Sequence, residues 1–556
     1  MERRWLRSLS AVEWRLAGQK RSRVLRVMNC SQADARYTDF DASRPARGHS
    51  RVFNLRSLWK HPLKLRTITV SVVSMLRYRT AEDFTFQRIG QTAGKYYPNP
   101  LLSRASSRDS NPRTGERAVT DHERMDPNVG RAALKKISWR LLPLLCVGYG
   151  IAYMDRVNIS FAALQMNDEL HFSATVYGLG GGLFFLSYCL LEIPSNLLLV
   201  RFGARRWISR IMFTWGILAI CMMFVKTPAQ FYAMRFMLGA AEAGFFPGVL
   251  FYLSNWFPEA HSGRAISRFY VSLPISVAFM GVLAAPLLNL QGMTTLSGWQ
   301  WLFLVEGIPA VIVSALIWRT LPDNPVQARW LSTEEQQWIV SRVSISGSSV
   351  LAADEHRLSA ALTSAYVWKF GFCNLLIMGS AYAFNLSAPA LLKVATRWDT
   401  AAVGLLISGT AIAGAVCMLI NGWHSDRHNE RYLHTIVPLS LMACSLGVIG
   451  SNYTPVLVIP AYVTYYLSSM AVQAAFWPLA SNTLRGRLSA VGLAAIGSIG
   501  MFGGFLGPVI WGIARDHTGS YRAGLLALGV LYVAVAASLL SLRSETRRSG
   551  VVVSLS

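Results

Sequence analysis

The sequence has few charged residues and almost none of the patterns that build catalytic or metal sites. Only 15% of its 556 residues are Asp, Glu, Lys or Arg, whereas 52% are hydrophobic and the mean hydropathy is +0.33. Its seven cysteines form no C-x-x-C pair, and its ten histidines form no HExxH motif. We therefore expect no enzyme activity, no catalytic residue, no metal site and no cofactor.

Acidic residues are especially scarce, so the net charge is strongly positive. The chain has 54 Lys and Arg against 29 Asp and Glu, a net charge of +25, and residues 1–124 alone hold 25 basic against 11 acidic residues. A basic balance can indicate nucleic-acid binding, but no helix-turn-helix, zinc finger or aromatic–basic platform is visible. We predict no nucleic-acid partner.

Residues 1–124 also lack an apolar run of the length, about 20 residues, that spans a bilayer. They are rich in Arg and Ser, which is typical of a disordered segment. Met125 opens a short basic stretch that leads into the first long apolar run. We interpret residues 1–124 as a basic, disordered leader and expect the native protein to begin at Met125.

Long apolar runs are what the sequence has in abundance. Six lie between residues 138 and 320 and six between 366 and 542, each long enough to cross a hydrocarbon core about 30 Å thick. A polar stretch separates the two sets. We predict an all-α, polytopic membrane protein of twelve transmembrane helices in two six-helix bundles, 125–320 and 366–543, with a central loop at 321–365 and a tail at 544–556.

The placement of arginine predicts the orientation of these spans. The loops after spans 2, 4, 8 and 10 are basic; their arginines are Arg201, Arg205, Arg206, Arg264, Arg427, Arg431, Arg485 and Arg487. The alternate loops are poorer in Lys and Arg, although Arg515 and Arg522 run against the trend. By the positive-inside rule, both termini and the central loop are predicted to be cytoplasmic.

Four charged residues interrupt otherwise apolar spans. Asp155 and Arg156 are adjacent in the first span, and Arg235 and Glu242 lie seven residues apart in the fourth, which places them on one helix face. An ionised side chain in the bilayer costs about 2.5–3.5 kcal/mol even on insertion scales, so such residues usually face a water-filled path. The four residues predict transport of a charged solute.

Longer stretches carry a resemblance to a known family. They are YMDRVNIS (153–160), LEIPSNLLLVRFGARRW (191–207), MRFMLGAAEAGFFPGVLFYLSNWFPE (234–259), GWQWLFLVEGIPA (298–310), LPDNPVQARWLSTEE (321–335), GWHSDRHNER (422–431), FWPLASNTLRG (476–486) and IGSIGMFGGFLGP (496–508). Together they resemble the major facilitator superfamily, and within it the anion:cation symporter family, in particular its bacterial branch for phthalate, hydroxyphenylacetate, tartrate and related acids. The resemblance covers residues 138–543.

The resemblance implies the fold of this superfamily and a secondary transporter that works by alternating access. It implies import of a small carboxylate together with protons, action as a monomer, and a place in the bacterial inner membrane, with the lipid bilayer as surroundings. An exporter or anion exchanger of the same fold, and a non-transporting sensor with that fold, are the alternatives.

Roles for the four charged residues follow from the resemblance. Asp155 and Glu242 match the family's proton-linked acids, and an acid buried beside an arginine can take up and release a proton. Arg156 is predicted to bind the substrate carboxylate through its planar fork. Arg235 is predicted to contact substrate, to tune Glu242 or to order the interface of spans 1 and 4. A static network that only locks the helices is the alternative.

Other residues are predicted around the substrate path and at the gates. Further substrate contacts are expected from Tyr153, Tyr188, Asn385 and Trp477. Gate contacts are expected from Glu192, Arg205, Arg206, Asp426, Arg427 and Arg431, of which the last three belong to the superfamily signature G-x-x-x-D-R-x-G-R-R in the second half. In the first half Val200 stands where the signature has its acid, so Glu192 is the expected partner of the basic loop. Glu306 is interpreted as a structural hydrogen-bonding residue.

One departure from the family bears on the substrate. Sugar-acid transporters of this family carry a glutamine in span 5 that contacts substrate hydroxyls, whereas this chain has Pro274 there. The loss of that amide argues against a polyhydroxy acid. It favours an aromatic or less hydroxylated carboxylate.

Overall fold

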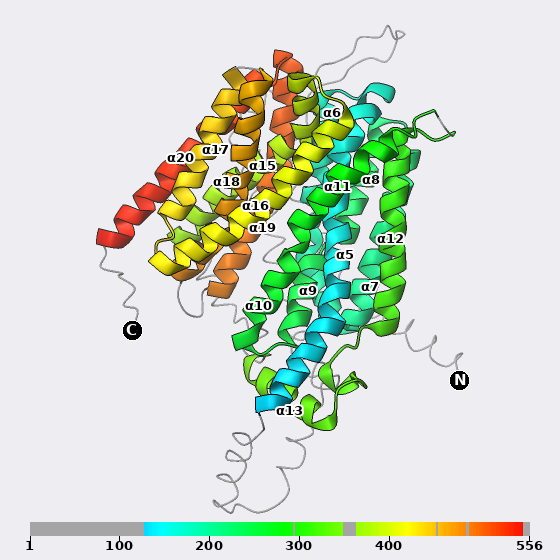
Figure 1. Ribbon diagram of the computed structural model, residues 1–556, viewed down its shortest axis with the longest axis vertical. Coiled ribbons are helices and arrows are strands. Elements are labelled where there is room, and N and C mark those ends of the chain that lie inside the picture. The colour runs from blue at the N-terminus through cyan, green and yellow to red at the C-terminus, as the bar shows by residue number, and fades with distance from the viewer. Residues whose placement is uncertain (1–126, 293–294, 348–362, 452–453, 485–488, 549–556) are drawn as a thin grey trace, which may run out of the picture. The chain divides into compact units, whose positions relative to one another are not determined.

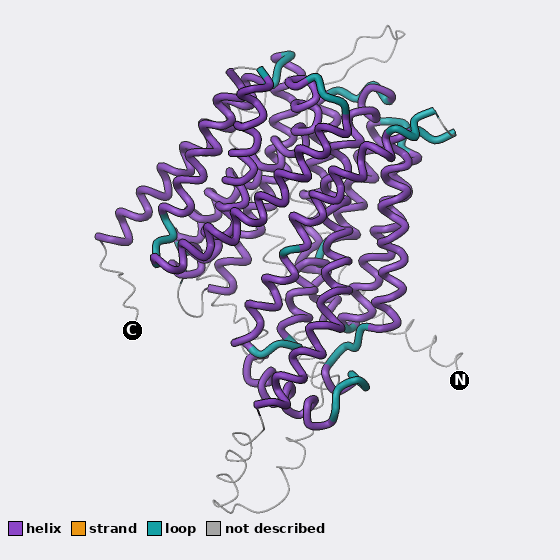
Figure 2. Tube along the Cα trace, viewed as in Figure 1, coloured by secondary structure: helices purple, strands orange, loops and turns teal. Residues whose placement is uncertain are grey.

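The computed structural model describes residues 127–292, 295–347, 363–451, 454–484 and 489–548. The chain divides into two units, Met1–Thr92 and Ala93–Ser556, and all described residues belong to the second. Outside the described residues lie the predicted leader and start, residues 1–125, together with Arg485 and Arg487. Every regular element in the described ranges is a helix, joined by short loops (Figure 2).

The helices fall into two sets (Figure 1). The first contains α5 (Pro127–Glu169), α6 (Ala174–Phe202), α7 (Ala204–Cys221), α8 (Pro228–Glu242), α9 (Phe245–Ser254), α10 (Glu259–Tyr270), α11 (Ser272–Leu288) and α12 (Gly298–Thr320). The second contains α15 (Ala365–Thr396), α16 (Thr400–His428), α17 (Leu433–Ser451), α18 (Pro455–Thr483), α19 (Ser489–Thr518) and α20 (Arg522–Arg548). The expected tail at 544–556 therefore begins within α20, and residues 549–556 are not described.

Twelve helical stretches are long and apolar enough to cross a membrane, with α8 and α9 forming one stretch and α10 and α11 another. The prediction of an all-α protein with twelve spans is thus confirmed. Large apolar side chains such as Ile275, Phe279, Leu405, Ile510 and Val530 are exposed on the outside of these spans. An apolar surface of this kind is expected where helices face lipid.

Polar residues in the loops set where several spans begin. The side chain of Ser173 accepts from the backbone N–H of Val176 at the start of α6, and Asp399 does the same for Ala402 at the start of α16. Such caps satisfy backbone donors that a helix leaves free at its first turn. At α12, Ser297 forms a capping box with Gln300.

Small residues bring the two sets of helices together. The most extensive contacts between the sets join α6 with α19, α11 with α16, and α5 with α15. At the α11–α16 crossing, a Cβ atom on Gly281 would lie 2.5 Å from the carbonyl oxygen of Gly404, so any larger residue would push the two backbones apart. Asp516 of α19 adds a polar contact, since it accepts from the backbone N–H groups of Ala174 at 3.0 Å and Thr175 at 2.8 Å.

The central loop carries a helix of its own, α13 (Thr333–Gly347), which packs on α5. Its first turn is capped reciprocally, because Ser332 Oγ accepts from Glu335 N–H while the Glu335 carboxylate accepts from Ser332 N–H. Glu335 also forms an ion pair of 2.8 Å with Lys136. The ring of Trp338 lies directly over Gly130, where a side chain would collide with it.

Candidate functional site

The centre of the site is an ion pair between two helices of the first set. Arg156 of α5 donates to Oε1 of Glu242 from Nε at 2.9 Å and from Nη2 at 2.6 Å. The side chain of Glu242 is 1% exposed and that of Arg156 is 9% exposed. The second carboxylate oxygen of Glu242 has no hydrogen-bond partner among the described residues. One oxygen of this buried acid is therefore free to take a proton.

Glu242 sits where the fourth span is broken. It is the last residue of α8, and Gly244 follows with a positive φ of 85° before α9 begins. A Cβ atom at Gly244 would lie 2.4 Å from Oγ of Ser195 on α6, so both its conformation and its packing require glycine. Irregular backbone at membrane depth occurs where it is buried in protein or lines a cavity. The break thus places the carboxyl of Glu242 beside α5.

Asp155 faces a different neighbour from the arginine next to it in sequence. It is 2% exposed, and its Oδ1 accepts from the side-chain amide of Asn158 at 3.4 Å. The same amide donates to the Glu306 carboxylate of α12 in a short contact. Oδ2 of Asp155 has no hydrogen-bond partner among the described residues. Asn158 therefore links two buried acids, and Glu306 makes the hydrogen bond expected of it.

Arg235 does not form an ion pair with Glu242, although both lie on one face of α8. Seven residues correspond to about 10.5 Å along a helix, too far for a direct contact. The guanidinium of Arg235 instead lies 4.9 Å from the ring centre of Phe184, and its Nε and Nη1 have no hydrogen-bond partner among the described residues. Arg235 is 2% exposed. Arg235 is therefore a buried cation with N–H donors that no described residue accepts.

A small cavity of about 50 Å³ lies beside these charges and is shared by both sets of helices. It is lined by Tyr153, Arg156, Val157, Ser160, Phe184, Phe185, Arg235, Tyr382, Asn385 and Leu386. Tyr153 and Asn385, both expected here from the sequence, do line it. Tyr188 is buried outside the lining but lies under the Arg156 guanidinium, 5.0 Å from the ring centre. Trp477 packs edge-on against Phe476, with ring centres 5.8 Å apart, and does not line the cavity.

Tyr382 is a lining residue that sequence reasoning missed. It lies one helical turn before Asn385 on α15 and packs against Phe185, with ring centres 4.1 Å apart. Residues three apart share a helix face, so the spacing to Asn385 is the signal that could have found it. Its phenol brings a neutral hydrogen-bonding group from the second set to a cavity whose charges come from the first.

Five of the six expected gate residues lie at the start of α7 or around the end of α16, whereas Glu192 lies inside α6, ten residues before its end. Arg205 contacts Asp323 of the central loop, through its backbone N–H at 2.8 Å and through Nε at 4.0 Å, whereas no ion pair joins it to Glu192 among the described residues. Arg206 is exposed. Arg431, just after α16, pairs at 2.9 Å with Asp426 in the last turn of that helix. Arg427 stacks on the neighbouring Trp423 ring.

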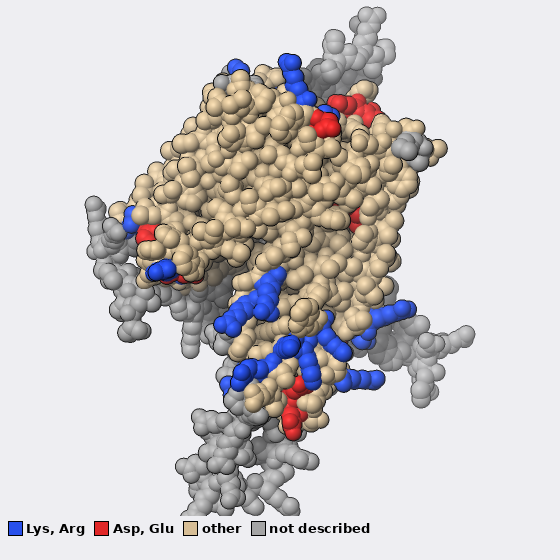
Figure 3. Space-filling view, viewed as in Figure 1, with Lys and Arg blue, Asp and Glu red and all other residues tan. Residues whose placement is uncertain are grey.

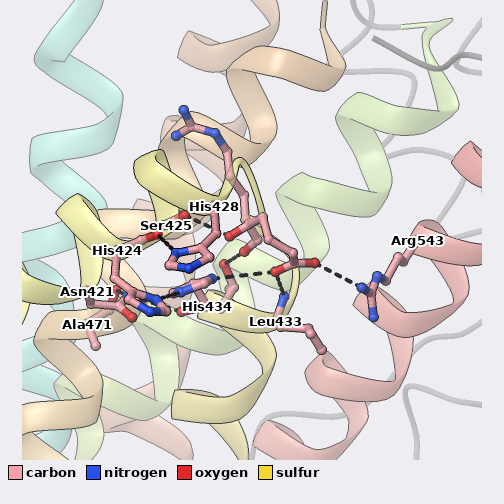
Figure 4. A network of polar contacts seen from close by, with 11 residues as sticks. Asn421, His424, Ser425, His428, Leu433, His434, Ala471 and Arg543 are labelled. Carbon is pink, nitrogen blue, oxygen red and sulfur yellow. Dashed lines mark hydrogen bonds and ion pairs between the residues drawn. The ribbon is translucent and has the colours of Figure 1, made fainter.

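Histidines at the end of α16 and the start of α17 form a network beside the turn between these helices (Figure 4). Ring nitrogens of His424 and His434 lie 2.6 Å apart, and Nδ1 of His428 lies 3.0 Å from the carbonyl oxygen of His424. Glu430 forms an ion pair of 3.1 Å with Arg543, which connects the turn to α20. These contacts stay within the second set. In the part of the chain that the structure describes, no group of His, Cys, Asp and Glu is placed to hold a metal ion.

The chain matches known transporters over most of its length. The model of the Major Facilitator Superfamily matches residues 145–508. A protein provisionally named metabolite transport protein NicT, from Pseudomonas putida, is 39% identical over 73% of this chain and 93% of its own. A quinolone resistance transporter from Acinetobacter baumannii is 36% identical over 72% of this chain and 92% of its own. A provisionally named tartrate transporter from Agrobacterium vitis is 36% identical over 74% and 92%.

Solved structures agree on the fold. A bacterial homologue of the human lysosomal transporter Spinster, in an inward-facing and occupied conformation, superposes with a TM-score of 0.60 at 15% identity, covering 73% of this chain and 96% of its own. An identity this low speaks for the fold alone. The twelve spans, the family match and the relatives together confirm the resemblance found in the sequence, and they point to a multi-pass membrane transporter rather than an enzyme. The chain belongs to the Major Facilitator Superfamily.

Proposed function

We propose that this transporter imports a small carboxylate together with protons by alternating access. The observation that carries the proposal is the Arg156–Glu242 pair at the edge of a cavity shared by both bundles. Arg156 is the natural ligand of a substrate carboxylate, because its planar fork can donate two parallel hydrogen bonds to it. In the resting site Glu242 occupies that fork.

Proton and substrate binding are coupled through competition for Arg156. A proton on Glu242 removes its charge and weakens its hold on the guanidinium, which then accepts the substrate carboxylate. The charges on Asp155, Arg156, Arg235 and Glu242 sum to zero when the neighbouring Glu306, hydrogen-bonded to Asn158, is neutral. One proton and one monovalent anion preserve that sum, and a net charge buried in the protein interior is costly.

The energetics of membrane crossing favour the same coupling. An interior-negative potential opposes entry of an anion by about 2.3 kcal/mol per charge per 100 mV, and a co-transported proton cancels that charge. Arginines lie at the ends of α6 and α16, and by the positive-inside rule they support our proposal that these ends, both termini and α13 are cytoplasmic. We place the protein as a monomer in the bacterial inner membrane.

Uptake into proteoliposomes tests the proposal. Radiolabelled aromatic and aliphatic carboxylates are offered under an inward proton gradient to wild type, Asp155→Asn, Glu242→Gln and the control Glu334→Gln, an exposed acid of α13. We expect accumulation by wild type and control that collapses with a protonophore, and none by the two site variants. Substrate accumulation that does not depend on the proton gradient and persists in both site variants would refute proton symport.

Export is a second candidate, supported by the relative named a quinolone resistance transporter. The same pocket chemistry serves a carboxylate leaving the cell if protons enter in exchange. Loading proteoliposomes with labelled quinolone and imposing an opposing proton gradient distinguishes the two candidates. Proton-driven efflux without carboxylate uptake would favour export.

A further inference from the structure

A second, larger cavity lies far along α5 from the central site. It has a volume of about 340 Å³ and shares no lining residue with the central cavity. It is formed where α5 meets α10, at the first turns of the spans Asn128–Glu169 and His261–Leu288. In a membrane, the hydrocarbon core gives way to lipid headgroups toward the ends of such spans.

Four cations surround this cavity, and no acid with a described side chain lines it. Its basic residues are Arg131, Lys135, Arg264 and Arg268, all exposed. None of the four forms an ion pair with an acidic side chain of the described residues, and the nearby Glu335 is engaged by Lys136. Figure 3 shows basic side chains gathered at this end of the molecule, with few acidic ones among them. Such a cluster of cations attracts an anion.

The wall of the cavity is apolar, which a site for a free inorganic ion does not need. Leu134, Phe257 and Ala265 line it, and the latter two are at most 4% exposed. Trp139 stands at its rim and is 74% exposed. Tryptophan at the end of a span is typical of the membrane interface, where its ring contacts lipid at the level of the headgroups.

His261 adds an unused polar atom to the lining. Its Nδ1 is buried and has no hydrogen-bond partner among the described residues. A neutral imidazole carries one N–H and one acceptor nitrogen, so Nδ1 in its protonated tautomer can donate to a phosphate oxygen. The cavity thus combines four cations and a spare donor with an apolar wall.

We propose that this cavity binds the phosphodiester headgroup of an anionic phospholipid, whose acyl chains lie along Trp139 and the apolar wall. Basic pockets between membrane helices commonly recognise such headgroups. In the orientation proposed above, the lipid belongs to the cytoplasmic leaflet. The basic segment 1–124 is a poor occupant, because its charge has the same sign as the cavity. The bound lipid bridges α5 to α10.

Native mass spectrometry of the full chain in detergent tests this site. Wild type is titrated with phosphatidylglycerol and, separately, with zwitterionic phosphatidylcholine. The pocket variant combines Arg131→Gln, Arg264→Gln and Arg268→Gln. A matched control removes the same charge from exposed positions outside the cavity, by Arg319→Gln, Arg329→Gln and Arg342→Gln.

We expect wild type and control to retain phosphatidylglycerol in preference to phosphatidylcholine, with the preference falling about fivefold for each cation removed from the cavity. Equal retention of phosphatidylglycerol by the pocket variant and the control would overturn the proposal. Displacement of the lipid by inorganic phosphate at the same concentration would also overturn it, because the site would then recognise the ion alone. If the triple variant does not fold, Arg264→Gln against Arg329→Gln provides the same comparison.

Discussion

The two bundles differ in what they bury. The first buries Asp155, Arg235, Glu242 and Glu306, each at most 3% exposed. The described residues of α15–α20 bury no charged side chain, only neutral polar groups such as that of Asn374. The bundles are alike in length and number of spans, so the difference reflects the site and not the demands of the fold.

This asymmetry has a mechanical consequence. Arg156 and Glu242 belong to α5 and α8 of the same bundle, so their ion pair is internal to that bundle. The second bundle meets the cavity with neutral groups, those of Tyr382, Asn385 and Leu386. The bundles can therefore rock against each other without breaking a buried ion pair, whose separation would leave costly unpaired charges. In the proposed function, the chemistry resides in the first bundle and the second acts as a neutral wall.

The strongest test of this division removes the cation of the central pair. Arg156→Gln leaves the Glu242 carboxylate buried without its partner, and breaking a buried pair in this way typically costs about 3–5 kcal/mol. We expect a large loss of thermal stability in detergent, measured by tryptophan fluorescence on heating, together with loss of transport.

The double variant Arg156→Gln/Glu242→Gln separates stability from function. Two neutral amides can hydrogen-bond to each other, so stability should return toward that of wild type while transport stays absent. If transport returned together with stability, the pair would be a helix lock only, and the site would have to lie elsewhere.

A second test concerns coupling. Asp155→Asn keeps the shape of the side chain and its contact with Asn158 but removes one proton-binding group. We expect accumulation against a gradient to fall to equilibration, while exchange of internal for external substrate continues, because exchange needs no net proton movement. The measurement is counterflow beside gradient-driven uptake. Gradient-driven accumulation at the wild-type level would remove Asp155 from the coupling path.

Substitution of a cavity-lining residue in the second bundle should have a milder effect on transport. Asn385→Ala removes a neutral hydrogen-bonding group worth about 0.5–1.5 kcal/mol, which corresponds to a rise in KM of about 2–10-fold. Its dependence on the proton gradient should match wild type. If Asn385→Ala abolished gradient dependence, coupling would extend across both bundles and the proposed division would be wrong.

The sequence predicted the spans well because each needs a long apolar run, and it found the buried acids because charge is rare in such runs. It did not predict partners. Arg156 pairs with Glu242 and not with its neighbour Asp155, since the depth and rotation of α5 against α8 decide which side chains meet. The break at Gly244 and the approach of Tyr382 likewise depend on contacts between helices distant in sequence. Apolar periodicity does not contain that information.

The smallest expected effect lies outside the bilayer, where α13 rests on α5. Burial raises the pKa of Glu335, but hydrogen bonds from the Lys136 ammonium and from Ser332 N–H outweigh it and hold the pKa below its usual value. A carboxyl whose pKa is lowered in the folded state stabilises the folded protein above the unfolded pKa of about 4.3, and this stabilisation is lost as the pH falls through the folded pKa.

Because Lys136 is half-exposed, Lys136→Met should cost at most about 1 kcal/mol. Hydrogen exchange of the α13 amides should therefore be faster in Lys136→Met than in wild type at neutral pH, and the difference should vanish below the folded pKa. An equal difference at both pH values would show that Lys136 holds α13 through its aliphatic stem and not through its charge.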